Sequence, residues 1–151
     1  MPYREVAPKH GVCPRCFAAL AGWSAIPGVF YCGTCGGVMA DNAASKRIVE
    51  TLDHTLLDIG FRASLGRSVE PDTTRIVSCP DCLADMKRVE VASAACEVDV
   101  CAEHGTWFDA GELETVMRAY RHQRARGASR VPAPPSATPL DDLLADSFRP
   151  A

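Results

Sequence analysis

Eight cysteines are the residues with the most evident chemistry in this chain of 151 residues. Most of them come in Cys-x-x-Cys pairs, such as Cys13-Pro-Arg-Cys16 and Cys79-Pro-Asp-Cys82. Two sulfur atoms at this spacing can point inward from a tight knuckle and share one ion. Because the chain shows no secretion signal, we interpret the pairs as metal ligands and not as a disulfide framework.

The spacing predicts two tetrahedral sites. Site 1 is C-x2-C-x15-C-x2-C and would use Cys13, Cys16, Cys32 and Cys35. Site 2 is C-x2-C-x18-C-x2-H and would use Cys79, Cys82, Cys101 and His104. Four such ligands fill a zinc shell and leave no position for water, so we expect two structural Zn2+ ions. An iron centre of rubredoxin type or a redox dithiol is the alternative, although imidazole among thiolates favours zinc at site 2.

The two sites form an internal repeat. The first knuckle of site 2 follows that of site 1 at an offset of 66 residues, and the second knuckle follows at an offset of 69. The difference falls between the knuckles, where apolar runs flank turn residues and predict a short β-hairpin in each copy. In the second copy, alternating apolar residues predict strands around 89–91 and 96–100, with the turn near 92–95.

A helix is expected after each hairpin. Apolar residues at helical spacing predict a helix over about 42–60, capped by Asp41, Asn42 or Ser45 and ended by Gly60. We expect its apolar face to pack on the first module or to mediate self-association with a second copy. The second helix would start at Asp109, with Glu112 completing a capping box. Its apolar stripe would be Leu113, Val116, Met117 and Tyr120.

Two single residues need a structural interpretation beside a functional one. Cys96 shares a strand face with Val98 and Val100, so we interpret it as a small buried residue and not as a ligand. Trp107 is interpreted as a plug beneath the zinc knuckle and not as a platform for a base.

The fold class that follows is a small α+β, metal-stapled protein. It consists of two tandem zinc-ribbon-like modules, each a β-hairpin with zinc knuckles followed by an α-helix, and a disordered Pro-rich tail. The expected segments are a lead-in at 1–9, a first module at 10–60, a linker at 61–75, a second module at 76–126 and the tail at 127–151.

Cys79-Pro-Asp-Cys82, followed by the run from Cys101 through Gly-Thr-Trp-Phe-Asp-Ala-Gly-Glu to Leu113, resembles the transcription-factor-IIB-type zinc-finger family of small bacterial and archaeal proteins. The resemblance covers residues 76–120 well and residues 10–50 more loosely, as expected for a tandem copy. It implies a zinc-ribbon fold and zinc binding, and it carries no particular activity.

Composition restricts the function classes. The net charge is −3, so any nucleic-acid binding would have to be local. Neither a membrane-spanning run nor a targeting segment is evident, and we expect a cytoplasmic protein without a membrane partner. We also find no catalytic constellation, so we do not expect an enzyme.

The leading hypothesis is an adaptor that mediates protein–protein interaction through its ribbon surfaces, helices and tail. An apolar face near the C-terminus would dock into a partner or fold back on its own chain; this face comprises Leu140, Leu143, Leu144 and Phe148. Nucleic-acid binding is the alternative, through a run of arginines at the end of the second helix that comprises Arg118, Arg121, Arg124, Arg126 and Arg130. A weaker alternative is a thiol sensor in which oxidation ejects zinc.

Overall fold

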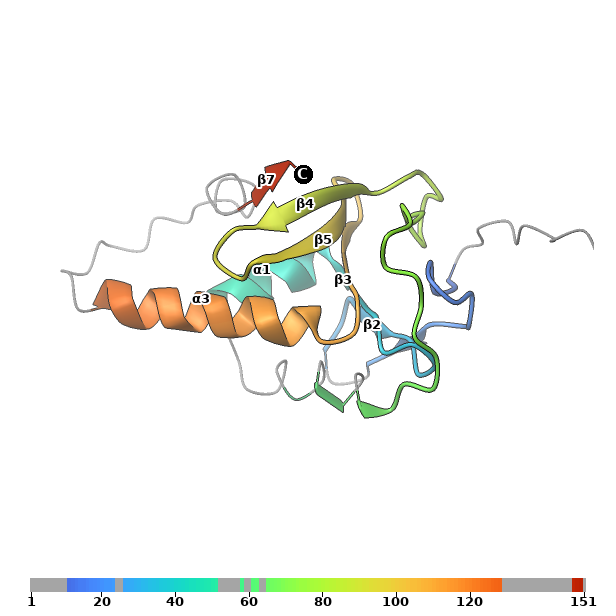
Figure 1. Ribbon diagram of the computed structural model, residues 1–151, viewed down its shortest axis with the longest axis horizontal. Coiled ribbons are helices and arrows are strands. Elements are labelled where there is room, and N and C mark those ends of the chain that lie inside the picture. Colours follow the sequence, from blue (N-terminus) through green and yellow to red (C-terminus); the bar gives the residue numbers. More distant parts are fainter. Residues whose placement is uncertain are drawn as a thin grey trace, which may run out of the picture.

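The computed structural model describes residues 11–23, 26–51, 58, 61–62, 65–128 and 148–150, with some further side chains left out (Figure 1). In the first half of the chain its elements are β1 (Ala21–Gly22), β2 (Val29–Tyr31), β3 (Val38–Asp41) and α1 (Asn42–Thr51). In the second half they are β4 (Lys87–Val91), β5 (Cys96–Cys101), β6 (Gly105–Phe108), α3 (Glu112–Ala128) and β7 (Phe148–Pro150).

The strands form one antiparallel sheet in the order β1-β2-β3-β6-β5-β4-β7. The two modules are therefore joined edge to edge, because β3 of the first pairs with β6 of the second. Each module contributes a third strand beyond the predicted hairpin. Trp107, which the sequence indicates as a plug beneath the zinc knuckle, lies in the strand β6 and is fully buried among the cysteines.

The pairing of β3 with β6 has the register of a symmetric strand pair. Val38 pairs with Phe108 and Met39 pairs with Trp107. At the repeat offset of 69, Val38 corresponds to Trp107 and Met39 to Phe108, so each strand pairs with its own counterpart in the opposite direction. The chain is thus an internal pseudo-dimer about an axis between these strands.

The two faces of the sheet carry different layers because side chains alternate along a strand. Val38 and Phe108 point into an apolar core shared with Ile48 of α1 and with the predicted stripe of α3. That stripe, Leu113, Val116, Met117 and Tyr120, is buried as predicted. On the other face, Met39 and Trp107 pack among the cysteines of both metal sites. The sheet therefore separates a helical layer from a zinc layer.

The helices begin at side chains that satisfy free backbone amides. Asp41 Oδ1 accepts a hydrogen bond from Ala44 N at 2.7 Å, which confirms Asp41 as the cap of α1. The two helices lie side by side (Figure 1), and Arg124 of α3 donates to the carbonyl oxygens of Val49 and Glu50 in the last turns of α1. The predicted end at Gly60 lies outside the described residues.

The hairpin predicted in the second module is confirmed, with Val91 pairing with Cys96 across the turn at 92–95. In the segment predicted as a linker, Phe61, Arg62 and Leu65 are helical, and Gly66 N donates to Arg62 O at 3.1 Å. Within the part of the chain that the structure describes, we find no helix long and apolar enough to cross a bilayer.

Candidate metal centres

Site 1 gathers Cys13, Cys16, Cys32 and Cys35, whose sulfur atoms all lie within 4.8 Å of one another. The sulfur atoms of Cys13 and Cys35 are 3.5 Å apart, and those of Cys16 and Cys32 are 3.4 Å apart. Cys13, Cys32 and Cys35 are buried, so this site is closed off from solvent on most sides.

Site 2 gathers Cys79, Cys82, Cys101 and His104 within the same 4.8 Å limit. The sulfur atoms of Cys82 and Cys101 are 3.8 Å apart, and Cys101 Sγ lies 3.5 Å from His104 Nδ1. His104 therefore presents Nδ1 to the other ligands. Cys82 is exposed, so site 2 is the more accessible of the two.

The first knuckle of each site has the same backbone hydrogen bonds. In site 1, Cys13 N donates to Ala18 O at 2.7 Å and Phe17 N donates to Cys13 O at 3.0 Å. The equivalent bonds of site 2 run from Cys79 N to Ala84 O and from Leu83 N to Cys79 O, both at 2.8 Å. Phe17 and Leu83 both have positive φ, 63° and 64°. The two knuckles therefore repeat in backbone conformation as well as in amino-acid sequence.

The ligand geometry fits tetrahedral zinc. Zn–S bonds of about 2.3 Å place two tetrahedral sulfur ligands about 3.8 Å apart, close to the observed separations. Backbone amides of the knuckles also point at the sulfur atoms, with Arg15 N and Asp81 N each 3.4 Å from Cys13 Sγ and Cys79 Sγ respectively. Such donors stabilise the thiolate form that zinc requires.

Burial opposes that charged form when no cation is bound. Burial is the main reason why the pKa values of the Cys79 and Cys16 thiols are each raised to about 11. Cys35 differs: its sulfur takes a hydrogen bond from Cys13, which lowers its pKa to about 6. Full deprotonation of both shells thus needs a divalent cation, and metal binding releases protons.

Both shells are complete with four protein ligands. A zinc ion held by four such groups has no open position for water, so its effect is to tie together chain segments that are distant in sequence. The two sites fit two structural zinc ions.

Arg15, between the two ligands of the first knuckle, is a residue that sequence reasoning missed. Its guanidinium is fully buried and lies 2.9 Å from Asp109 and 3.1 Å from Asp99, both in the second module. It also donates to the carbonyl oxygens of Asp72, Thr73 and Arg75. The only sequence signal was a cation inside a knuckle, where a solvated side chain is the usual expectation.

Asp109 differs from its predicted role. Both of its side-chain oxygens accept hydrogen bonds from Arg15, and Oδ1 also accepts one from Trp107 Nε1 at 3.0 Å. A buried guanidinium is a stronger partner than a helix amide, which explains why this carboxylate does not serve as the expected cap. The other half of the capping box is confirmed, since Glu112 Oε2 accepts from Asp109 N at 2.8 Å.

Trp107 lies between the two metal sites and not only beneath its own. It is fully buried, and its ring contacts the backbone of Gly37, two residues after Cys35 of site 1. A methyl group at Gly37 would come within 2.0 Å of this ring. The position of the Trp107 ring thus leaves no room for a side chain at position 37 in the first module.

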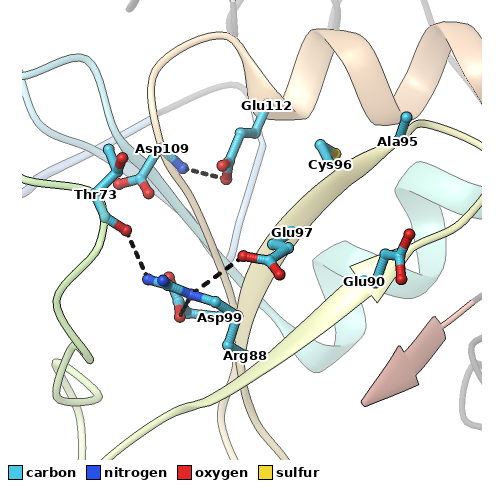
Figure 2. A pocket seen from close by; sticks show the side chains of 9 residues that line it. All are labelled: Thr73, Arg88, Glu90, Ala95, Cys96, Glu97, Asp99, Asp109 and Glu112. Atoms are coloured by element: carbon cyan, nitrogen blue, oxygen red, sulfur yellow. Dashed lines mark hydrogen bonds and ion pairs between the residues drawn. The ribbon is translucent and has the colours of Figure 1, made fainter. Parts of the chain in front are cut away.

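A cavity of about 550 Å3 lies beside the Arg15 cluster, between the β4–β5 hairpin and the start of α3 (Figure 2). Its walls carry Thr73, Arg88, Glu90, Ala95, Cys96, Glu97, Asp99, Asp109 and Glu112. Burial, with the nearby Asp109 charge, raises the pKa of Glu112 to about 7. Burial also raises the pKa of Asp99, although Arg88 and Arg15 lie beside it.

Cys96 lines this cavity and packs against the apolar core with Val98 and Val100, although it is only half-buried and not fully buried as its strand position predicted. Burial and the charge of Glu112 raise the pKa of its thiol to about 11. At neutral pH Cys96 is therefore a thiol, which is a poor nucleophile and a poor ligand.

The arginines proposed for nucleic-acid contact lie on α3, except Arg130, which lies outside the described residues. Arg118 forms an ion pair with Glu114 one turn away, and Arg124 is engaged with the end of α1. Arg121 and Arg126 lie in the C-terminal half of α3. Arg121 is half-buried and Arg126 is exposed.

The docking residues predicted near the C-terminus are placed only in part. Leu140, Leu143 and Leu144 lie outside the described residues. Phe148 lies in β7, where it pairs with Val91 of β4, so it is in a strand and not on the expected helical face. Strand pairing satisfies backbone groups along the edge of the sheet, which a short helix could not do.

Comparison with known families agrees with this geometry. The family model described as the transcription factor zinc-finger matches residues 78–119, which contain all four ligands of site 2. The second module is thus similar to zinc ribbons of this type, and the cluster at Cys13–Cys35 fits a looser tandem copy. No curated protein and no solved structure matched the chain.

Proposed function

We propose that this zinc-binding protein is a non-enzymatic adaptor whose surface binds another protein. The metal ions hold the framework, and both of their shells are filled by protein ligands. The partner would be recognised by apolar side chains that the framework holds at its surface.

The observation that carries the proposal is the segment from residue 61 to residue 76, which connects the modules. Four of its large apolar side chains are exposed, with Leu65 at 68% and Ile76 at 69%, and with Phe61 and Val69 above 40%. Exposed apolar side chains concentrated in one segment are typical of interaction surfaces. Leaving large apolar side chains in contact with water has a free-energy cost that binding of a partner would offset.

The described part of this segment is also held in place. Ser68 N and Val69 N both donate to Thr34 O, inside the second knuckle of site 1, at 2.7 and 3.1 Å. Further along, the carbonyl oxygens of Thr73 and Arg75 accept from Arg15. A segment anchored at both places loses less conformational freedom on binding than a loose loop would.

Affinity purification from the native cell tests the proposal. A Leu65→Ser/Ile76→Ser chain should lose a protein partner that the unaltered chain captures. An Arg67→Ser/Glu70→Ser chain is the matched control, because it changes an exposed ion pair in the same segment. Capture of the same proteins by all three chains, each with two zinc ions, would contradict the proposal.

Nucleic-acid binding remains the second candidate. The arginines of α3 and the match to a transcription factor zinc-finger support it, while the net charge of −3 opposes it. If it holds, affinity for DNA or RNA should fall steeply with salt, and Arg118→Ser/Arg121→Ser/Arg126→Ser should flatten that slope. Affinity that is independent of salt, or unaffected by these changes, would remove this candidate.

A further inference from the structure

Arg15 connects the two halves of the molecule in a way that the zinc sites alone do not explain. Its backbone belongs to the first knuckle of site 1, where Arg15 N lies 3.4 Å from Cys13 Sγ. Among the described residues, the six hydrogen bonds that its guanidinium donates all go to the connecting segment or to the second module.

The position of this guanidinium depends on the knuckle. Cys13 and Cys16 flank Arg15, so a bound ion holds the backbone from which the side chain extends. When the knuckle opens, that backbone loses the constraint and the guanidinium loses its fixed position. Closing the knuckle, conversely, places the charge in its buried pocket.

The second module depends on the same guanidinium. The side chains of Asp99 and Asp109 are only 3% and 8% exposed, and both are paired with Arg15. Arg88 approaches Asp99 as well, at 3.3 Å, whereas the ion pairs described for Asp109 involve Arg15. Removing one partner of a buried pair leaves an uncompensated buried charge, which is strongly destabilising.

Asp109 extends this dependence to site 2. Its Oδ1 accepts from Trp107 Nε1, and the Trp107 ring packs in the cluster that contains Cys79 and Cys101. A continuous set of buried contacts therefore runs from the knuckle of site 1, through Arg15 and Asp109, to Trp107 and the ligands of site 2.

We propose that Arg15 is a positioning residue that couples the two metal sites, so that zinc bound at site 1 favours zinc at site 2 and the reverse. Such coupling is reciprocal by thermodynamic necessity. Couplings of this kind change affinity by about 5- to 150-fold.

Native mass spectrometry of the full chain during zinc removal by a chelator tests the coupling. In the unaltered chain, the species with two zinc ions should give way to the zinc-free species with little one-zinc species between them. In Arg15→Met, the one-zinc species should accumulate, because the sites then lose their ions independently.

A second variant separates coupling from simple loss of stability. Arg15→Met/Asp99→Asn/Asp109→Asn removes the buried charges together, which is tolerated far better than removing one partner. This chain should stay folded and still accumulate the one-zinc species. Arg118→Ala, which changes an exposed arginine in a local ion pair, is the matched control and should behave like the unaltered chain.

A one-zinc species equally abundant in the unaltered and triple-variant chains would overturn the proposal, even if the variant were less stable.

Discussion

Single residues in this protein are constrained by groups that lie far away in sequence. Glu112 is a clear case: its carboxylate accepts from Asp109 N and lines the acidic cavity beside Asp99. Burial raises its pKa from 4.5 to about 7, so the folded protein holds a proton that the unfolded chain releases at lower pH. The consequence is a measurable dependence of stability on pH.

The contribution of Glu112 to the free energy of unfolding should fall as pH rises from 4.5 through 7, because its carboxyl ionises first in the unfolded chain. Glu112→Gln keeps an acceptor for Asp109 N and removes the charge. At pH 8 the free energy of unfolding of this variant should therefore exceed that of the unaltered chain by up to about 3 kcal/mol. The difference should shrink toward pH 6. Urea unfolding with excess zinc at several pH values measures this. Glu70→Gln, at an exposed ion pair, is the control, and a constant difference across pH would contradict the prediction.

Gly37 is a second constrained position. A methyl group there would meet Trp107 at 2.0 Å, whereas one at Gly33 would have no atom within 4 Å. Gly37→Ala should destabilise the protein by about 1–3 kcal/mol by overpacking, and Gly33→Ala should change stability little. Thermal unfolding of the zinc-loaded proteins compares them. Equal losses in the two variants would show that the Trp107 contact does not determine the tolerance of Gly37.

At the scale of elements, the pairing of β3 with β6 makes one sheet from two short ones. Each module has only three short strands, too few to bury much apolar surface alone. Joined, they share a core between sheet and helices and a second cluster around the cysteines. The edge of this sheet is covered by β7, which pairs with β4 from Val89 to Val91.

Deleting residues 129–151 should uncover the β4 edge without affecting either metal site. Amide hydrogen exchange should become faster in residues 87–91, while exchange in β3 and β6 at the centre of the sheet should not change. Zinc content should remain at two ions per chain. Unchanged exchange in β4 would mean that β7 does not protect this edge in solution.

The whole molecule behaves, on this structure, as one unit held by two metal ions. Zinc in small modules contributes roughly 10–16 kcal/mol, comparable to the entire stability of a domain. Since the cysteine cluster includes ligands from both sites, loss of metal at either site should affect the shared core.

Metal analysis of the purified chain should therefore find two zinc ions, and a chelator should unfold the protein as followed by circular dichroism. Cys32→Ser should hold no more than one ion. Cys96→Ser is the matched control, because Cys96 packs on the core and belongs to neither ligand set, and it should keep both ions. One ion or none in the unaltered chain would contradict the assignment of the sites.

Residue spacing alone was sufficient to predict both ligand sets, since a knuckle forms from neighbouring residues and its chemistry is local. The same holds for the β4–β5 hairpin, whose alternation and turn lie within a few residues. The apolar stripe of α3, including Leu113 and Met117, could be read for the same reason.

The tertiary structure alone decided how the modules meet. The β3–β6 pairing, the contact of Gly37 with Trp107 and the burial of Arg15 against Asp109 each join residues about 70 or more positions apart. No local pattern distinguishes a buried guanidinium from a solvated one, because the difference lies in which carboxylates the fold brings to it. Ligand identity is a local property of the chain, whereas the proposed coupling between the sites depends on long-range contacts of Arg15 that only the tertiary structure forms.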